Sequence, residues 1–344
     1  MRKKLICFIM AALLLASLAG CGEPVSDTTV STATDSPAAG TPSSAVTGTD
    51  TDEPAETDDD SADPVGTEDL HIVSTVTNGS WTAKITETDM LGEDDPAPVT
   101  TIALTGDSAN ISGGGASFAD GYVVITAGGT YSLSGSLNGG VIVNIPDVAK
   151  AHLILRGVDI TSDAYSALAV ICADKVVITL ADGTVNKLTD GTSYTYSYSK
   201  TVIPNACLFS KDDLTINGSG SLEVTGRFNN GISTKDDLTV LGGNISVTAA
   251  NHGLRGNDLV LITDGKIDIK CKKDGIKSSN DTDKTKGFLF ITGGDITVSA
   301  EDDALQAVTA LYVTGGHVSA SFGGKSTNCP GKVSVKAGCL TEED

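Results

Sequence analysis

The chain has 344 residues and carries 44 acidic against 23 basic side chains, a formal net charge of −21 at pH 7. This acid excess excludes the usual kind of nucleic-acid-binding protein, which needs a basic face. The sequence has no Walker loop, no GxSxG motif and only four histidines, so nucleotide- and serine-dependent chemistry finds no support.

Residues 1–20 have the pattern of a signal peptide. Three basic residues precede an apolar run that ends at Gly20 and is too short for a stable membrane span. The tetrapeptide LAGC, ending at Cys21, resembles a bacterial lipobox, which implies cleavage before Cys21 and a lipid on its thiol. The alternative is an ordinary secretory signal with a chance cysteine. Both the lipoprotein signal and the ordinary secretory signal predict export. The lipobox also predicts a lipid anchor on the outer face of the cell membrane, and we expect this anchor to be the only membrane contact.

Residues 21–69 are predicted to be the lipidated cysteine followed by a disordered tether. From residue 22 to residue 69 there are thirteen acids, no lysine or arginine, and almost no large apolar side chains. Such a segment buries too little surface to offset its chain entropy, and its charges repel one another. We expect it to hold the folded part away from the membrane.

Three kinds of short segment recur in the remaining chain. The first contains the apolar anchors Ile232, Leu254, Ile276 and Leu305, which are 22, 22 and 29 residues apart. The second reads DDLTI, DDLTV, NDLVLI, GFLFI and TALYV, and the third follows Gly-rich turns as SLEV, NISV, KIDI, DITV and HVSA. The seven additional residues in one period fit the polar insertion NDTDKTKG.

These repeats predict an all-β fold, a right-handed single-stranded parallel β-helix over residues 100–340 with three short strands per turn of about 22 residues. A propeller blade would need about 40 residues, and a leucine-rich repeat would show a helical half. Residues 70–99, with Trp81, are predicted to cap the open edge of the first turn.

Five cysteines follow Cys21, and no two have the CxxC spacing of a zinc or redox motif. Cys329 and Cys339 could close a loop near the C-terminus. The odd number argues against a full disulfide framework, so buried thiols are the expectation for the others, Cys172, Cys207 and Cys271.

Equivalent positions of successive turns lie above one another at about 4.8 Å, so recurring side chains form columns. Carboxylates on adjacent turns can then share a cation, and calcium suits several oxygen donors better than magnesium does. This predicts a calcium site at Asp274, Asp302 and Asp303, with Asn280 and Asp281 nearby.

The alternative is that Asx side chains only cap turns through the backbone. We favour that alternative for three asparagines and expect two acid pairs to be polar turn corners: Asn229, Asn230 and Asn251, and Asp212-Asp213 and Asp236-Asp237.

Two further features suggest contact with sugars. Arg255 and Lys277 follow successive anchors, and two outward cations beside calcium would suit the carboxylates of an acidic polysaccharide. Tyr194, Tyr196 and Tyr198 alternate at period two, so their rings would share one face of a strand and could pack on sugars. The alternatives are an ordinary charged surface ladder and an insertion whose rings cover the flank of the fold.

Long stretches, including PNACLFSKDDLTINGSGSLEVTGRFNNGISTKDDLTV and KGFLFITGGDITVSAEDDALQA, resemble a carbohydrate-binding domain family of exported parallel β-helix proteins from anaerobic bacteria. The resemblance covers about residues 130–320. It implies a pectate-lyase-like fold, bound calcium and adhesion to plant cell-wall polysaccharides such as cellulose and pectin. Of the Asp-Asp-Gly-Ile turns associated with calcium in the family, Asp302-Asp303-Ala304-Leu305 matches best, and the earlier turns lack one or both acids.

Three functions stay open at this point. We expect a monomeric, non-catalytic protein that binds polysaccharide, with acidic sugars favoured by the basic pair. A calcium-dependent lyase would also need a base, such as Arg255 or Lys277, beside the proton α to a uronate carboxylate. A structural adhesin would use the repeat only to project a surface.

Overall fold

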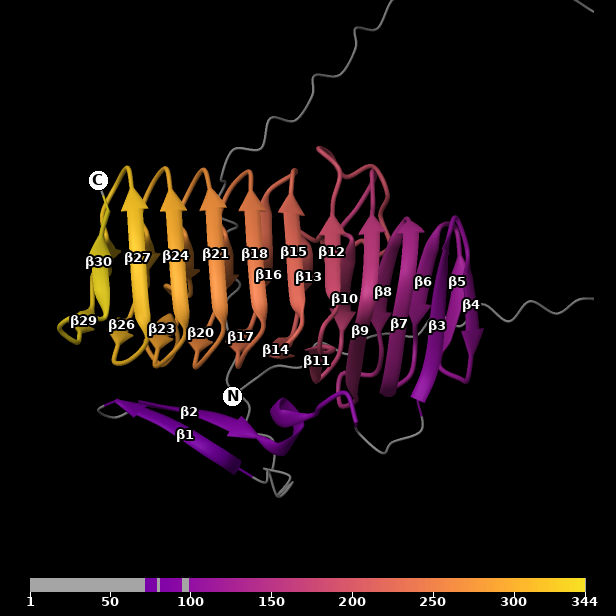
Figure 1. Ribbon diagram of the computed structural model, residues 1–344, viewed down its shortest axis with the longest axis horizontal. Coiled ribbons are helices and arrows are strands. Elements are labelled where there is room, and N and C mark those ends of the chain that lie inside the picture. Colours follow the sequence, from indigo (N-terminus) through magenta and orange to yellow (C-terminus); the bar gives the residue numbers. More distant parts are fainter. Residues whose placement is uncertain (1–71, 79–80, 95–98, 344) are drawn as a thin grey trace, which may run out of the picture. The chain divides into compact units, whose positions relative to one another are not determined.

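The structure, a computed structural model, describes residues 72–78, 81–94 and 99–343 (Figure 1). The predicted signal peptide, Cys21 and the tether lie outside these residues. Within them the regular structure is β-strand, apart from one 3-10 turn, η1 (Glu87–Met90). No helix among the described residues is long and apolar enough to cross a membrane. The predicted all-β class is therefore confirmed.

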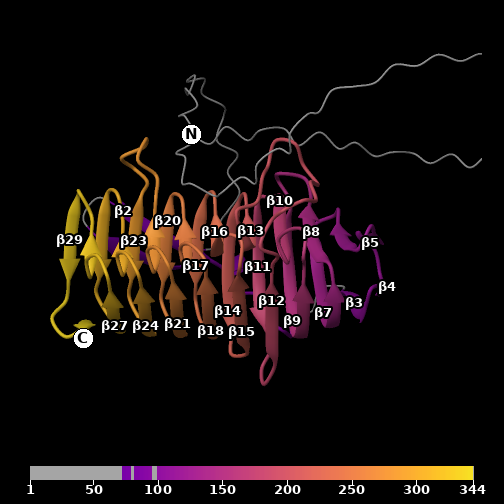
Figure 2. The same cartoon turned by 90° about the horizontal axis from the view of Figure 1, so that it is seen from above.

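Most strands belong to parallel ladders in which each strand pairs with the equivalent strand of the next repeat, as in β14–β17 and β15–β18. Figures 1 and 2 show these strands side by side in chain order. Ladder A contains β6 (Tyr122–Ile125), β8 (Gly140–Asn144), β10 (Leu168–Cys172), β13 (Ala206–Ser210), β16 (Asn230–Thr234), β19 (Leu254–Gly256), β22 (Ile276–Ser278), β25 (Leu305–Gln306) and β28 (Thr327–Asn328).

Two further ladders complete each turn of the chain. Ladder B contains β11 (Lys175–Leu180), β14 (Asp213–Gly218), β17 (Asp237–Val240), β20 (Leu259–Ile262), β23 (Phe288–Ile291), β26 (Ala310–Val313) and β29 (Lys332–Val335). Ladder C contains β12 (Val185–Thr189), β15 (Ser221–Gly226), β18 (Asn244–Ala249), β21 (Lys266–Cys271), β24 (Asp295–Ala300), β27 (His317–Phe322) and β30 (Leu340–Glu342). The three recurring segments of the sequence correspond to these three ladders.

The first turns are built from longer strands that join ladders B and C: β3 (Val99–Gly106), β7 (Gly129–Asn138) and β9 (Lys150–Thr161). β9 pairs with β11 through its first half and with β12 through its second. Between the halves Gly157 takes a positive φ of 79°, and the Asn186 side chain accepts its N–H at 2.9 Å. Glycine adopts that conformation without a Cβ clash, so the strand bends without leaving the sheet.

The apolar anchors confirm the predicted register. Ile232 pairs with Leu254, Leu254 with Ile276, and Ile276 with Leu305. All four are fully buried and belong to one continuous core, which inward side chains of the three ladders fill. The alternation of buried and exposed residues in ladder C, as in β18 and β21, shows one face on the core and one on solvent.

The segment predicted to cap the first turn lies elsewhere. β1 (Ile72–Asn78) and β2 (Trp81–Thr86) form an antiparallel hairpin, and Ala83 and Ile85 of β2 pack on the outer face of ladder B, against Phe290 and its neighbours in β20, β23 and β26. The hairpin covers apolar side chains that the later repeats turn outward. The prediction was therefore wrong about the place, because this contact joins residues far apart in sequence.

The first turn is covered instead by two short antiparallel strands. β4 (Ala109–Ser112) pairs with β3, and β5 (Ala116–Ala119) pairs with β6. Ile111 and Phe118 are partly buried against the core. Antiparallel additions of this kind end a parallel stack without leaving its apolar interior open.

Of the described cysteines, four are free thiols, whereas Cys172, expected to be a buried thiol, is disulfide-bonded. Cys207, Cys271, Cys329 and Cys339 are free, so the loop that Cys329 and Cys339 could have closed is not formed. Burial raises the pKa of the Cys207 and Cys271 thiols. Raised pKa values keep thiols protonated and inert.

Candidate functional site

A column of buried polar side chains runs along the corner that leads into ladder A. Asn230, His252, Asp274 and Asp303 occupy equivalent places in four successive turns. Each accepts the backbone N–H of its successor: His252 N lies 3.2 Å from Asn230, Asp274 N 3.1 Å from His252 Nδ1, and Asp303 N 3.2 Å from Asp274. Asp303 continues the pattern by accepting the N–H of Lys325 at 2.9 Å. These side chains hold consecutive turns together, whereas the alternative considered from the sequence was that Asx side chains cap their own turns.

His252 is neutral in this column. Burial, with the charges of Lys277, Arg255 and Lys273, lowers its pKa to about 2. Its Nδ1 therefore keeps a lone pair that accepts the Asp274 N–H. The 3.3 Å between His252 Nδ1 and Asp274 Oδ2 is consequently a close approach and not an ion pair.

The structure brings together the three predicted calcium ligands on the last turns of this column. Asp274, Asp302 and Asp303 each offer an oxygen within 4.8 Å of the others. Asp274 Oδ2 lies 3.3 Å from Lys277 Nζ, and Asp303 Oδ2 accepts the side-chain N–H of Asn328 at 2.6 Å. Burial raises the pKa of Asp274, although Lys277 opposes the shift. The Asp302 side chain is 49% exposed and is the most accessible of the three.

Asn280 and Asp281 do not complete that group. Asn280 follows β22, at the opposite end of the strand from Asp274, and its Oδ1 accepts the N–H groups of Thr282 and Asp283 at 3.1 and 2.9 Å. Its Nδ2 donates to Asp258 Oδ1 at 2.8 Å. Asn280 thus shapes the inserted turn, and Asp281 is exposed on that turn.

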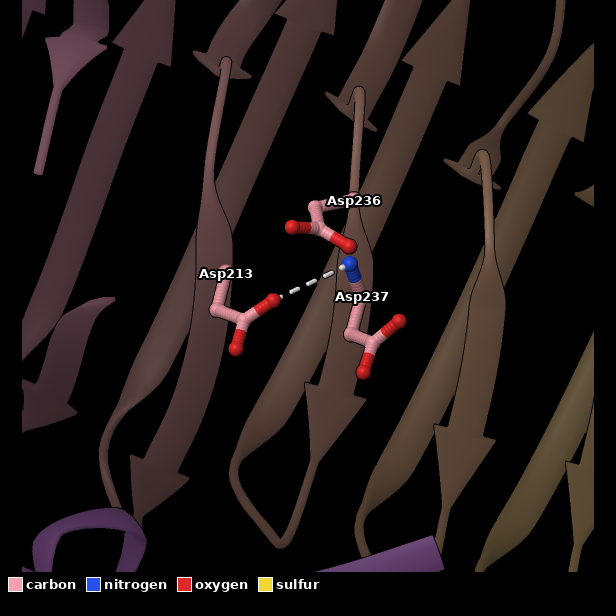
Figure 3. A group of neighbouring side chains, drawn as sticks. All are labelled: Asp213, Asp236 and Asp237. Carbon is pink, nitrogen blue, oxygen red and sulfur yellow. Dashed lines mark hydrogen bonds between the residues drawn. The ribbon is translucent and has the colours of Figure 1, made fainter. Parts of the chain in front are cut away.

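A second group of carboxylates lies at the N-terminal ends of two neighbouring strands of ladder B. Asp213 starts β14, Asp237 starts β17 on the next turn, and Asp236 precedes it (Figure 3). All three offer oxygens within 4.8 Å of one another, and the backbone N–H of Asp237 donates to Asp213 Oδ1 at 3.4 Å. The sequence predicts polar turn corners at Asp212-Asp213 and Asp236-Asp237, and the structure brings three of these four carboxylates together. The sequence feature that could have indicated this group is the Asp-Asp pair, which recurs at the same register in two successive repeats.

Arg255 and Lys277 are paired neighbours in β19 and β22, as predicted. Lys277 reaches back to Asp274, and Arg255 Nε donates to Ser279 Oγ at 3.1 Å. Both side chains are partly exposed, so the pair presents a positively charged strip on the outer side of ladder A.

The three tyrosines lie on the insertion between β12 and β13, residues 190–205, with their rings packed on the outer side of ladder A. Tyr196 stacks on Tyr122 with ring centroids 4.3 Å apart, and Asn144 donates to the Tyr198 hydroxyl at 3.2 Å. Each of the three residues stays partly exposed. The tyrosines therefore cover the flank, as one alternative expected, and also leave aromatic surface at the solvent.

Asp190, which the sequence did not single out, anchors this insertion. It is 0% exposed, and burial raises its pKa to about 6 even though it accepts hydrogen bonds. Its Oδ2 lies 2.7 Å from the Tyr194 hydroxyl, and its Oδ1 accepts the backbone N–H of Arg227 at 2.5 Å. One buried carboxyl group thus fixes the positions of two chain segments.

These features define an all-β protein of stacked parallel strands with acidic corners, a basic strip and an aromatic flank. Residues 119–341 match the family model described as carbohydrate-binding domain-containing protein, and the chain belongs to that family.

Two relatives extend the comparison. A carbohydrate-binding domain-containing protein of Acetivibrio thermocellus is 44% identical over 136 residues, which are 39% of this chain and 48% of the relative. The chain thus spans about half the length of this curated relative. A solved polysaccharide lyase-like protein from C. thermocellum, a gadolinium derivative, is similar with a TM-score of 0.70 and 40% identity, over 72% of this chain and 100% of that chain.

Proposed function

We propose that this chain is a non-catalytic polysaccharide-binding protein of the cell surface, folded as a right-handed parallel β-helix. The observation that carries the proposal is the family match across residues 119–341, which includes the basic strip and the aromatic flank. The right hand follows the rule for parallel strands joined by crossovers. Plant cell-wall glycans such as cellulose or pectin are the proposed ligands.

The anchoring and oligomeric state are parts of the same proposal. The lipobox-like sequence at Cys21 would give a lipid anchor on the outer face of the cell membrane after export. The acidic tether would place the binding domain at a distance from that anchor. The domain would act as a monomer.

Calcium is the proposed cofactor, and the donor chemistry of two groups fits it. Calcium takes about six to eight oxygen ligands at about 2.3–2.6 Å. Asp274, Asp302 and Asp303 supply carboxylates at one corner, as Asp213, Asp236 and Asp237 do at another. Gadolinium, present in the derivative of the solved relative, is also a hard cation. At Asp274 an ion would compete with the Lys277 ammonium, and Asn280 and Asp281 stay outside the proposed ligand set.

A bound calcium ion would supply positive charge that neutralises carboxylates on adjacent turns. Without it, this chain's own groups hold the turns: the side chains of Asp274 and Asp303 accept backbone N–H groups of the next turn. We therefore propose that calcium adds to a stack that these hydrogen bonds already order.

A polysaccharide lyase is the second candidate, because the solved relative is described as lyase-like. Elimination needs a base that accepts the proton α to a uronate carboxylate. The two basic candidates are engaged, Lys277 by Asp274 and Arg255 by Ser279. This favours binding over catalysis.

The test is co-sedimentation of the full chain with insoluble cellulose, pectin and xylan, with calcium and with chelator. Circular dichroism of the same samples shows whether the protein stays folded. We expect retention on at least one polysaccharide, and weaker retention with chelator. Ultraviolet absorbance of unsaturated product from polygalacturonate would favour the lyase instead.

A further inference from the structure

The turn that follows ladder C is longer beside the tyrosine insertion than in the later repeats. Gly226 pairs with Ala249, and Asn229 accepts the N–H of Asn251. Two residues, Arg227 and Phe228, therefore lie between Gly226 and Asn229, where the next turn has only Ala250. The additional residue places an arginine and a phenylalanine at the surface.

Phe228 is exposed, but one face of its ring is packed. Its ring stacks on Tyr194 with centroids 4.3 Å apart and an interplanar angle of 27°, while 38% of the residue stays exposed. Tyr194 also contacts Tyr165 in a tilted arrangement, with ring centroids 5.7 Å apart. Aromatic rings have an electron-rich face that attracts positively polarised C–H groups. A flat ring fixed from behind is a platform on which the apolar face of a sugar can pack at little entropic cost.

The Arg227 side chain is exposed, and among the described residues it forms no ion pair. Its backbone is fixed, because its N–H donates to the buried Asp190, which also holds the Tyr194 hydroxyl. A guanidinium group presents planar donors that match a carboxylate in a two-pronged geometry. The neighbouring charge makes a neutral sugar a less complementary ligand than an acidic one.

We propose that Phe228, backed by Tyr194 and flanked by Arg227, forms a subsite for a uronic-acid residue of an acidic polysaccharide. The sugar ring packs on Phe228, and its carboxylate binds Arg227. This inference rests on the proposed polysaccharide binding and adds the surface that would hold an acidic sugar. In the simpler alternative, Phe228 only shields Tyr194 from water.

The experiment is affinity gel electrophoresis of the full chain through polygalacturonate and, separately, through neutral soluble xylan. We expect Phe228→Ala and Arg227→Ala each to weaken binding to polygalacturonate roughly three- to tenfold. Phe228→Tyr should retain binding, and Arg227→Lys should retain part of it. Ile203→Ala, which removes an exposed apolar side chain from the tyrosine insertion that Phe228 packs on, is the matched control and should bind as wild type does.

The outcomes separate this inference from the proposed function. Wild-type retention by polygalacturonate that neither Phe228→Ala nor Arg227→Ala weakens would overturn the subsite and leave polysaccharide binding intact. Retention by xylan alone would overturn the assignment to uronic acid. If wild type binds neither, the inference fails, and co-sedimentation with cellulose then decides whether the proposed function fails as well. Melting temperatures identify a variant that does not fold, and Arg227→Ala removes only an exposed side chain, so the test does not depend on Phe228→Ala.

Discussion

Lys175 Nζ lies 2.7 Å from Oδ1 of Asp89, a carboxylate that is 1% exposed. The same oxygen accepts the Thr215 hydroxyl at 2.6 Å, and Oδ2 accepts the backbone N–H of Thr86 at 2.8 Å. Asn217 Nδ2 donates to the carbonyl of Asp89 at 2.8 Å. This network joins the segment that follows the N-terminal hairpin to the outer face of ladder B, next to the apolar contact of Ala83 and Ile85.

Asp89→Ala should destabilise the fold, because it leaves the partly buried ammonium of Lys175 and a buried hydroxyl without their acceptor. Removing one partner of a buried ion pair costs about 3–5 kcal/mol. Urea unfolding of the full chain measures the difference. Arg156→Ala is the control: Arg156 binds Glu93 at 2.8 Å but its side chain is 41% exposed, so the cost should stay within about 1 kcal/mol. Equal effects of the two variants would contradict the assigned role of Asp89.

The same carboxylate makes stability sensitive to acid. Burial alone raises the pKa of Asp89, but the charge of Lys175 and the hydrogen bonds it accepts outweigh burial and lower the pKa. The stabilisation is therefore present above the unfolded value of 3.8 and is lost as pH falls through the folded pKa. In Asp89→Asn the free energy of unfolding should depend less on pH below 3.8 than in wild type.

Asp190 should have the opposite pH dependence. Burial raises its pKa from 3.8 to about 6, so the folded state binds the proton more tightly. This contribution is fully present below pH 3.8 and is lost as pH rises through about 6. Asp190→Asn keeps an acceptor for the Arg227 N–H and should remove a pH-dependent loss of about 1–3 kcal/mol between these values. Parallel wild-type and variant curves over that range would contradict the prediction.

Two substitutions of Asp274 distinguish its structural role from a role in metal binding. Asp274→Ala removes the acceptor of the Asp303 N–H and the partner of Lys277, which should cost about 1–3 kcal/mol in urea unfolding. Asp274→Asn keeps an oxygen for that N–H and should cost less. If calcium binds at this corner, calcium titration should show weaker binding to the asparagine variant, which folds but lacks one negative ligand. Unchanged calcium affinity in Asp274→Asn would remove Asp274 from the ligand set.

Gly253 precedes the anchor Leu254 where no side chain fits. A Cβ there would lie 2.3 Å from Ile269 Cγ2 and 2.6 Å from the Gly275 carbonyl oxygen. Gly253→Ala should therefore destabilise the fold by about 1–3 kcal/mol, as overpacking does in cores. Gly92→Ala, where a Cβ meets nothing within 4 Å, is the matched control and should change stability by less than about 0.5 kcal/mol. Thermal unfolding of both variants measures these losses of stability, and equal losses would contradict the prediction.

The repeat could be predicted because its information is local and periodic. The spacing of Ile232, Leu254 and Ile276 fixes the register, and a slip of one residue would turn every anchor to the solvent. The same periodicity brought Arg255 beside Lys277 and grouped Asp274 with Asp303.

What the sequence did not reveal depends on tertiary contacts. Nothing in the hairpin indicates that Ile85 packs near Phe290, over two hundred residues later in the chain. Asn280 is close to Asp274 in sequence, but the intervening strand β22 places it at the other end. Nothing in the sequence singled out Asp190, because its burial depends on the insertion that follows it.

The most direct test is a depletion isotherm of the full chain on insoluble pectin, with unsaturated product measured in the same supernatant. The account predicts that the protein is removed from solution in a saturable manner and that absorbance from unsaturated product does not rise. Folded protein that stays in solution at every amount of pectin, cellulose and xylan would contradict polysaccharide binding. Depletion accompanied by steady release of unsaturated product would contradict the non-catalytic assignment.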